Sequence, residues 1–315
     1  MPKKKNGKKQ MNWKDKLIIL AVLIVLAIIA HYIDNTNMAV IANVIENSII
    51  DSQKTDLNGD ILKIYYIDVG QADCTLIVNK NKTMLIDAGN NEDGQLIVEY
   101  IKSLGIEKID YLVGTHAHED HIGGIDNIIK SFDIGTVYFP YTTEKTTTMR
   151  TFEEIVDCLV EKNLSITTVN IGDKFKVGNA KCEIMHVDNS EPEETNDQSI
   201  CIRLVYGTQS FLFMGDATQT VENTRNWPET SVLKVGHHGS NYSSSKRFIE
   251  QVNPKIAIIS VGKNNDYGHP KDSVLKKLKN VNAKIYRTDK LGTILITCDG
   301  ISIDVTSFKT NTNGI

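Results

Sequence analysis

The stretch YLVGTHAHEDHIGGI, from Tyr111 to Ile125, places three of the chain's eight histidines and an aspartate within six positions, directly after an apolar run. His116 and His118 are two positions apart, so in an extended segment their side chains point the same way and can hold one cation. Asp120 and His121 leave the turn in another direction and can hold a second cation. Imidazole and carboxylate ligands together suit Zn²⁺ or Mn²⁺ and leave positions open for water.

Four apolar runs along the chain end in the same kind of polar residue. They are MLIDAG at Asp87, YLVGTHAHEDH at His116, FLFMGDA at Asp216 and VLKVGHHGS at His237. In open α/β sheets, ligand-binding residues gather where buried strands give way to loops, so we expect these endings to converge at one sheet edge. Asp216 can bridge both cations with its two oxygens. His237 can complete the second site, and His238 is the rival for that role.

Short apolar runs alternate with turn residues and with segments of helical period from residue 61 to residue 308. The predicted strands of the first half are ILKIYYIDVG, CTLIVNK, TMLIDAGN and YLVGTH, with helices at QLIVEYIKSLG and IDNIIKSF. Those of the second half are CIRLVYG, SFLFMGD, VLKVGHHG, KIAIISVG, KIYRT, TILITC and ISIDV, with helices at SSKRFIEQV and DSVLKKLKNV. This alternation indicates an α/β domain over 61–308, followed by a tail over 309–315.

The N-terminal region differs in composition from the rest. Residues 1–16 hold seven of the 35 Lys and Arg residues and one of the 39 acidic residues, and an apolar run begins at Leu17 and extends to Ile33. This predicts a transmembrane signal anchor over 17–33, with the basic segment 1–16 in the cytoplasm and the following chain outside the cell. A cleaved signal peptide, and hence a secreted protein, is the alternative. Residues 34–60 are interpreted as a stalk and linker.

The remaining chain is acidic. After residue 30 it has 28 of the 35 basic residues against 38 of the 39 acidic ones, a formal charge near −10. Such a domain has no overall attraction to nucleic acid, whose non-specific binding depends on phosphate neutralisation. An anionic polymer would therefore need a metal or a local basic patch.

Other reactive motifs are absent from the sequence. The five cysteines are widely spaced and form no C-x-x-C pair, so they are predicted to be buried apolar residues and not a disulfide framework. The sequence contains neither G-x-S-x-G nor a P-loop. The histidine and carboxylate cluster is therefore the favoured site of chemistry.

Taken together, the motifs resemble those of the metallo-β-lactamase-fold hydrolases, and more narrowly the soluble hydrolase domain of the ComEC/Rec2 competence family. The resemblance runs from about Ile61 to Asp304 and is carried by DVGQADCTLIV, LIDAG, THAHEDHIGG, NDQS, FMGDA, LKVGHHGS and SVGKNNDYGHP. It implies a four-layer αββα sandwich with two divalent metal ions, Zn²⁺ or alternatively Mn²⁺. The implied ligands are His116 and His118 at the first metal, Asp120, His121 and His237 at the second, and Asp216 between them.

The sequence departs from the broad superfamily at one ligand of the first site. The usual third histidine is not visible, and ETNDQSICIRL places Asn196 or Asp197 at the matching turn. Asn196 is the candidate metal ligand. Asp197, His186 in EIMHVDNS, and water are the alternatives.

Two loops are predicted to form the rim of the site. Tyr267 and His269 follow the predicted strand KIAIISVG, and His238 and Ser240 follow VLKVG. We expect all four to contact substrate, and Asp120 and His269 to act in catalysis, His269 by orienting substrate or stabilising developing charge. The alternatives are an ordinary Gly/Pro-shaped turn around His269, and a serine-rich helix cap from Ser243 to Ser245.

Two cations that share a water lower its pKa toward neutrality and polarise the bond under attack. The sequence therefore predicts an exported, membrane-anchored hydrolase of phosphoester bonds. The resemblance favours nucleic acid as its substrate, and a cell-wall polymer is the rival substrate. A phosphorylcholine-type or wall-polymer esterase and a β-lactamase-like hydrolase are alternative enzymes. A surface binding module that has lost the chemistry is the non-enzymatic alternative, and the sequence indicates no protein partner.

Overall fold

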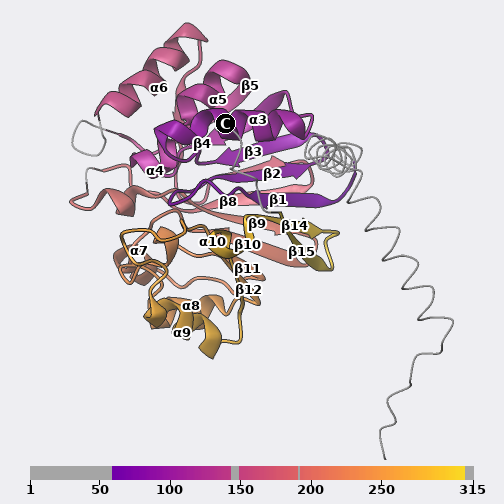
Figure 1. Ribbon diagram of the computed structural model, residues 1–315, viewed down its shortest axis with the longest axis vertical. Helices are drawn as coiled ribbons and strands as arrows, with labels where there is room; N and C mark the ends of the chain where they lie inside the picture. The colour runs from indigo at the N-terminus through magenta and orange to yellow at the C-terminus, as the bar shows by residue number, and fades with distance from the viewer. Residues whose placement is uncertain (1–58, 143–148, 191, 309–315) are drawn as a thin grey trace, which may run out of the picture. The chain divides into compact units, whose positions relative to one another are not determined.

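Two β-sheets packed face to face form the centre of the computed structural model, which describes residues 59–142, 149–190 and 192–308 (Figure 1). The first sheet has the order β15 (Ile303–Phe308), β14 (Thr293–Cys298), β1 (Leu62–Tyr66), β2 (Thr75–Asn79), β3 (Lys82–Ile86), β4 (Lys108–Val113), β5 (Asp133–Phe139), β6 (Ile166–Thr168). The second has the order β13 (Lys284–Arg287), β12 (Ile256–Ile259), β11 (Val232–Lys234), β10 (Gln209–Phe213), β9 (Cys201–Tyr206), β8 (Ala180–His186), β7 (Lys174–Val177).

Helices cover the outer face of each sheet (Figure 1). On the first sheet these are α3 (Gly94–Ser103), α5 (Ile125–Ser131) and α6 (Met149–Glu161), whose buried Ile97, Ile128 and Ile155 share a core with strand residues such as Leu112. On the second sheet α8 (Lys246–Val252) and α9 (Asp272–Asn280) contribute to a separate core. A third core fills the space between the sheets. The layers are consistent with the predicted αββα sandwich.

Parallel pairing brings the polar strand endings to one end of the sheets. In the first sheet β3 runs parallel to β4. In the second, β10, β11 and β12 run parallel to one another. Strands that are parallel and adjacent deliver their carboxyl ends to the same edge, as expected for a ligand site in an α/β sheet.

The predicted strands and helices of residues 61–308 all form. Strands β5 to β8, helix α6 and the short helices α4 (Glu119–Ile122), α7 (Gln219–Asn223) and α10 (Thr288–Leu291) were not predicted. All five cysteines are free and buried, which confirms the prediction for them. The predicted anchor over 17–33, the tail over 309–315 and nearly all of the stalk lie outside the described residues. Among the described residues, no helix has both the length and the apolar character needed to cross a membrane.

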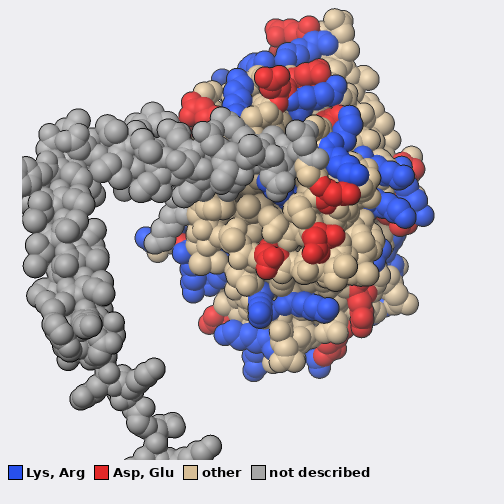
Figure 2. Space-filling model, turned by 90° about the vertical axis from the view of Figure 1, so that its right-hand side faces the viewer, with Lys and Arg blue, Asp and Glu red and all other residues tan. Residues whose placement is uncertain are grey.

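Surface charges of both signs are interspersed on the face drawn in Figure 2. Lys and Arg side chains lie among Asp and Glu side chains over the part of this face that is not grey. On this face the charges form no broad surface of one sign.

Candidate metal centre

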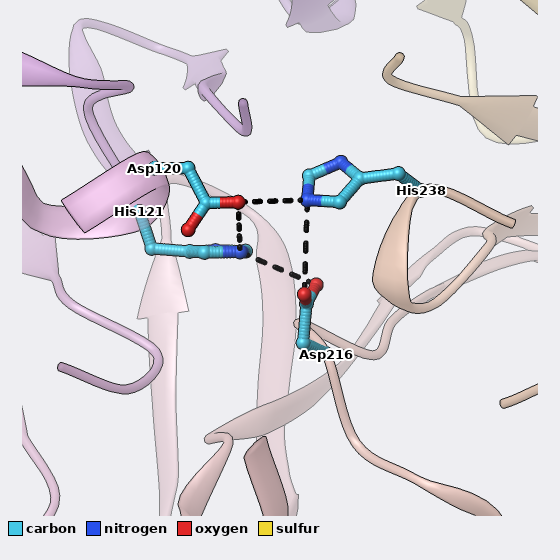
Figure 3. Close-up of side chains that lie close together, drawn as sticks. All are labelled: Asp120, His121, Asp216 and His238. Carbon is cyan, nitrogen blue, oxygen red and sulfur yellow. Dashed lines mark hydrogen bonds and ion pairs between the residues drawn. The ribbon is translucent and has the colours of Figure 1, made fainter. Parts of the chain in front are cut away.

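Four side chains converge at the end of the sheets where the parallel strands finish (Figure 3). They are Asp120, His121, Asp216 and His238, and one ligand atom from each lies within 4.8 Å of the others. The His121 Nε2 atom is 3.3 Å from Asp216 Oδ1, and the His238 Nε2 atom is 3.2 Å from Asp120 Oδ2. Two imidazoles and two carboxylates are a donor set that suits Zn²⁺ or Mn²⁺.

The elements that carry these residues explain their positions. Asp120 and His121 lie in the short helix α4 (Glu119–Ile122), which directly follows the loop after β4. Asp216 follows β10, and His238 lies in the turn after β11. The cluster is therefore built from both sheets, with two residues after a strand of the first and two after strands of the second.

His116 and His118 lie beside this cluster. The His116 Nε2 atom is 3.1 Å from His118 Nδ1, and the ring centroids of His116 and His121 are 4.2 Å apart. Two ring nitrogens that face each other at this distance can share a cation, as the spacing of the motif predicts. Burial, and then the neighbouring His121, lowers the pKa of His116 well below its usual range. The ring is therefore neutral, as a metal ligand must be.

Asn196, Asp197 and His186 are the three residues predicted as alternatives for the remaining position of the first site. The Asn196 side chain is buried, its Nδ2 donates to Glu194 Oε1, and its Oδ1 has no partner among the described residues. The Asp197 carboxylate accepts hydrogen bonds from the backbone N–H and hydroxyl of Thr218. The His186 Nε2 atom lies 2.9 Å from the Asp197 carbonyl oxygen. Asn196 therefore has the unsatisfied acceptor that a ligand would offer.

The adjacent histidines of the GHHG turn take different positions. His238 is 2% exposed and belongs to the four-residue cluster, whereas the His237 side chain is 21% exposed and its Nε2 atom is 3.7 Å from Asp216 Oδ2. Both have positive φ angles, 54° and 51°, so the turn is left-handed at two successive residues. His238 thus belongs to the cluster, but His237 lies beside it, with its Nε2 at the same 3.7 Å from Asp216 Oδ2 as that of His238. The buried Nδ1 of His237 has no hydrogen-bond partner among the described residues, so His237, the residue preferred from sequence, stays a prediction beside His238 for the second-site ligand.

Asp87 contacts the ring nitrogen of His121 that faces away from the four-residue cluster. Its Oδ2 atom is 2.8 Å from His121 Nδ1, and its two oxygens accept hydrogen bonds from the backbone N–H and the hydroxyl of Thr115. When His121 Nδ1–H donates to Asp87, the lone pair of Nε2 faces the cluster, which is the usual way an outer carboxylate orients a ligating histidine. The sequence interpretation noted Asp87 as a strand ending but gave it no role.

The electrostatics of the cluster favour positive charge. Burial would lower the pKa of His121, but the carboxylates of Asp216, Asp120 and Asp87 outweigh burial and raise this pKa well above its usual range. Burial opposes ionisation of Asp216 too, yet His121 and His238 hold the pKa of its carboxyl well below its usual range. The buried atoms His121 Nε2 and Asp216 Oδ1 have no hydrogen-bond partner among the described residues. Divalent cations fit this set of ligand atoms that lack hydrogen-bond partners.

The rim residues lie as a row of rings leading away from the cluster. The centroids of His237 and His269 are 5.9 Å apart, and Tyr267 stacks on His269 with centroids 5.7 Å apart. Burial, followed by the nearby His237, lowers the pKa of His269 to about 4, and the Tyr267 side chain is well exposed. Asn265 fixes the loop, because its amide bonds to the backbone of Gly262 and of His269.

The serines after GHHG have structural partners. Ser240 is 1% exposed, and its hydroxyl accepts a hydrogen bond from the backbone N–H of Tyr242. The hydroxyl of Ser245 accepts from the backbone N–H of Phe248 and caps helix α8. The cap interpretation is therefore confirmed for Ser245, and Ser240 remains a predicted substrate contact that has little exposed surface.

Comparison with known proteins points to the same fold. The family model described as the metallo-beta-lactamase superfamily matches residues 67–263. ComE operon protein 3 of Bacillus subtilis is 29% identical over 252 residues, which cover 72% of this chain and 32% of that protein. Recombination protein 2 of Haemophilus influenzae is 29% identical over 237 residues, which cover 73% of this chain and 28% of that protein. The predicted resemblance to the ComEC/Rec2 family is confirmed, and the chain spans about a third of the length of these relatives.

A solved structure supports the fold independently. The metallo-beta-lactamase fold protein YhfI from Bacillus subtilis superposes with a TM-score of 0.54 at 12% identity, and the match covers 76% of this chain and all of that one. At this identity the likeness concerns the fold alone. Because the matched family segment covers more than half of the chain and contains the whole cluster from Asp120 to His238, the chain belongs to the metallo-beta-lactamase superfamily of metal-dependent hydrolases.

Proposed function

We propose that this protein hydrolyses phosphoester bonds with two divalent cations, Zn²⁺ or Mn²⁺, held at the convergent cluster. The observation that carries the proposal is the arrangement of Asp120, His121, Asp216 and His238 next to the facing pair His116 and His118. When bound there, such cations lower the pKa of water toward neutrality and provide positive charge for an anionic substrate. The protein itself is acidic, so the bound cations would provide the attraction to an anionic phosphoester.

Each residue has a distinct task in this proposal. His116, His118 and Asn196 would hold the first cation, Asp120, His121 and His238 would hold the second, and Asp216, which lies between the two groups, would serve both. Asp87 keeps the proton of His121 on Nδ1, away from the cluster.

Beyond the ligands, the row of rings contacts the substrate. His269 is neutral at physiological pH because its pKa is about 4, so it can donate or accept one hydrogen bond at the substrate. Tyr267 offers an exposed ring face next to it, on which a leaving group can stack.

The candidate substrates are nucleic acid and a phosphoester with a cationic leaving group. Nucleic acid is favoured by the similarity to ComE operon protein 3 and Recombination protein 2. A phosphoester with a cationic leaving group, of the phosphorylcholine type, is favoured by a cavity of about 790 Å³ that borders Asp120 and Tyr267. Six carboxylates and one lysine line it: Asp68, Glu92, Asp93, Glu119, Asp120, Asp289 and Lys263. This lining repels an anionic chain and attracts a quaternary ammonium group, to which Tyr267 adds a cation–π contact.

The proposal is tested with purified full-length protein. Metal content is measured together with hydrolysis of bis(p-nitrophenyl) phosphate, p-nitrophenylphosphorylcholine, single- and double-stranded DNA and a chromogenic cephalosporin. We expect bound metal and phosphodiester hydrolysis, both lost in Asp216→Asn and reduced in His116→Ala. His186→Gln, which changes a buried histidine bonded to a backbone carbonyl, should keep both. Equal metal content and activity in wild type and Asp216→Asn would refute the proposal.

The location of the protein is proposed from the sequence alone. We expect the segment over 17–33 to anchor the chain in the cell membrane as a single pass, with the catalytic domain outside the cell. Protease treatment of intact cells should then digest the domain, and cell fractionation should recover it with membranes. Recovery from the culture medium with a new N-terminus would support the secreted alternative.

A further inference from the structure

A buried ion pair lies directly behind the candidate metal centre. Lys234, the last residue of β11, is 3% exposed, and its Nζ atom is 2.7 Å from Oδ2 of Asp73, which is 4% exposed. Asp73 belongs to the connection between β1 and β2 of the first sheet, whereas β11 belongs to the second. The pair therefore joins the two sheets at the end where the site is built.

Asp73 also touches candidate ligands on both sides of the cluster. Its backbone N–H donates to the carbonyl oxygen of Asp120 over 3.0 Å. Its Oδ1 atom is 3.5 Å from Nδ1 of His238, the ring nitrogen on the side away from Asp120, and this nitrogen is also 3.1 Å from the carbonyl oxygen of Ser260. Asp73 is thus hydrogen-bonded to the backbone of the ligand from the first sheet. Its Oδ1, which has no hydrogen-bond partner among the described residues, places a carboxylate beside the ring of the ligand from the second sheet.

The charge of Lys234 accounts for the presence of Asp73 at this place. Oxygens of Asp73 and Asp87 and a nitrogen of His121 lie within 4.8 Å of one another, so two carboxylates crowd behind the same histidine. Two such anions repel each other unless a cation is close. The ammonium group of Lys234 supplies that cation. An apolar side chain could fill this buried position in the run VLKVG equally well. Because a buried ion pair is by itself weak evidence of stabilisation, packing alone does not account for the lysine.

We infer that Lys234 and Asp73 are positioning residues for the second metal, because together they fix the ring of His238 and the backbone of Asp120 in ligating positions. The inference rests on the metal binding in the proposed function. Their effect is transmitted through His238 and Asp120, and they take no part as ligands. Partners of this kind typically contribute 10–100-fold to metal affinity.

The test uses the whole chain with Lys234→Met or Asp73→Asn, and Lys82→Met controls for the loss of an exposed, ion-paired lysine away from the site. Lys82 is also ion-paired at 2.7 Å, with Asp110 on the first sheet. The affinities of both cations are measured by chelator competition, the absorption spectrum is recorded after Co²⁺ substitution, and thermal midpoints are measured with and without metal. We expect Lys234→Met and Asp73→Asn to weaken one of the two cations about 10–100-fold and to alter the Co²⁺ spectrum. Lys82→Met should match wild type in both.

The outcomes separate the possible failures. Wild-type affinities and spectra in both variants, with a lower midpoint of the metal-free protein alone, would show a merely structural ion pair and overturn the inference. If Lys234→Met does not fold, Asp73→Asn decides alone, because it preserves size while removing the charge. A wild-type protein that binds two cations but hydrolyses no phosphoester would refute the proposed function while the affinities still test the inference. A wild type without metal would overturn both.

Discussion

Replacing Asp87 with asparagine should weaken metal binding by trapping His121 in the wrong tautomer. The Asp87 carboxylate is the acceptor for three donors, namely the backbone N–H and the hydroxyl of Thr115 and the Nδ1–H of His121. Asparagine has the same size but only one acceptor oxygen. If that oxygen stays with the backbone N–H of Thr115, the amide NH₂ faces His121 Nδ1. The ring then carries its proton on Nε2, which is the atom 3.3 Å from Asp216 Oδ1.

The size of the effect follows from this geometry. Metal binding at Nε2 requires the proton to return to Nδ1, where it meets the amide NH₂, so one buried donor loses its acceptor. An unsatisfied buried donor costs about 1–3 kcal/mol. This corresponds to a loss of roughly 5–150-fold in the affinity of the cation that His121 holds, and at saturating metal the metal-dependent part of the unfolding free energy falls by the same amount.

The assay is urea unfolding with excess chelator and with excess Zn²⁺, so that the metal-dependent increment is obtained separately for each variant. In the metal-free protein a proton can stay on Nε2 of His121, so we expect a smaller change there. Asp110→Asn is the control, because Asp110 also accepts a backbone N–H, from Thr83, but lies away from the cluster. An increment in Asp87→Asn equal to that of wild type would refute the tautomer argument.

Three further changes test other parts of the site. Asn196→Asp gives the first cation an anionic oxygen, so chelator competition should show tighter binding of one ion; unchanged affinity would mean that this side chain does not face the metal. The pKa of His269 is lowered from 6.5 to about 4, so between these values the folded protein binds fewer protons than the unfolded chain, and stability falls as the pH drops through that window. Metal-free His269→Gln should therefore lose less stability than wild type between about pH 7 and pH 5 in urea unfolding, and equal losses would contradict the shift. Ser245→Ala removes the cap of α8 and should lower the unfolding free energy by about 0.5–2 kcal/mol without changing metal content, whereas a phosphate-binding role would lower activity instead.

The strands that the sequence predicted are those with strong apolar patterns. Strands β1 and β2 are buried at every position, and such continuous runs are visible in a sequence. Strands β6 and β7 were missed because most of their residues are exposed or half-buried, which leaves no apolar pattern to detect. Helix α6 is a different case, since Phe152, Ile155 and Leu159 recur at helical spacing and the signal was present.

The choice between His237 and His238 shows where sequence reasoning stops. The two residues are chemically identical and adjacent, so composition and spacing cannot separate them. Their side-chain directions depend on the left-handed backbone at both positions, and this conformation is set by contacts of the turn with distant segments. One such contact joins the backbone N–H of His237 to the carbonyl of Gly215 after β10.

Lys234 lies inside the apolar run VLKVG, and a lysine at such a position is itself a signal. A buried lysine requires an anionic partner, but that partner, Asp73, is 161 positions away and belongs to the other sheet. The packing of the two sheets determines this pairing, and no local pattern in the sequence encodes it. The residue types of the site were thus predictable, whereas the contacts between the sheets were not.

The charge balance of the folded site links these contacts to metal binding. Four carboxylates surround His121 and His238, namely Asp73, Asp87, Asp120 and Asp216. Asp73 is paired with Lys234, whereas the ion-pair partners of the other three carboxylates within the described residues are histidines. Burial lowers the pKa of His238, but Asp216 and Asp73 outweigh burial and raise it, as the carboxylates do for His121. The metal-free protein therefore balances its carboxylates with protons on these two rings. The carboxylates that raise the two pKa values also attract a cation, and a cation that binds there must displace those protons. Protons and metal therefore compete for the two rings, and metal affinity should fall as the pH falls.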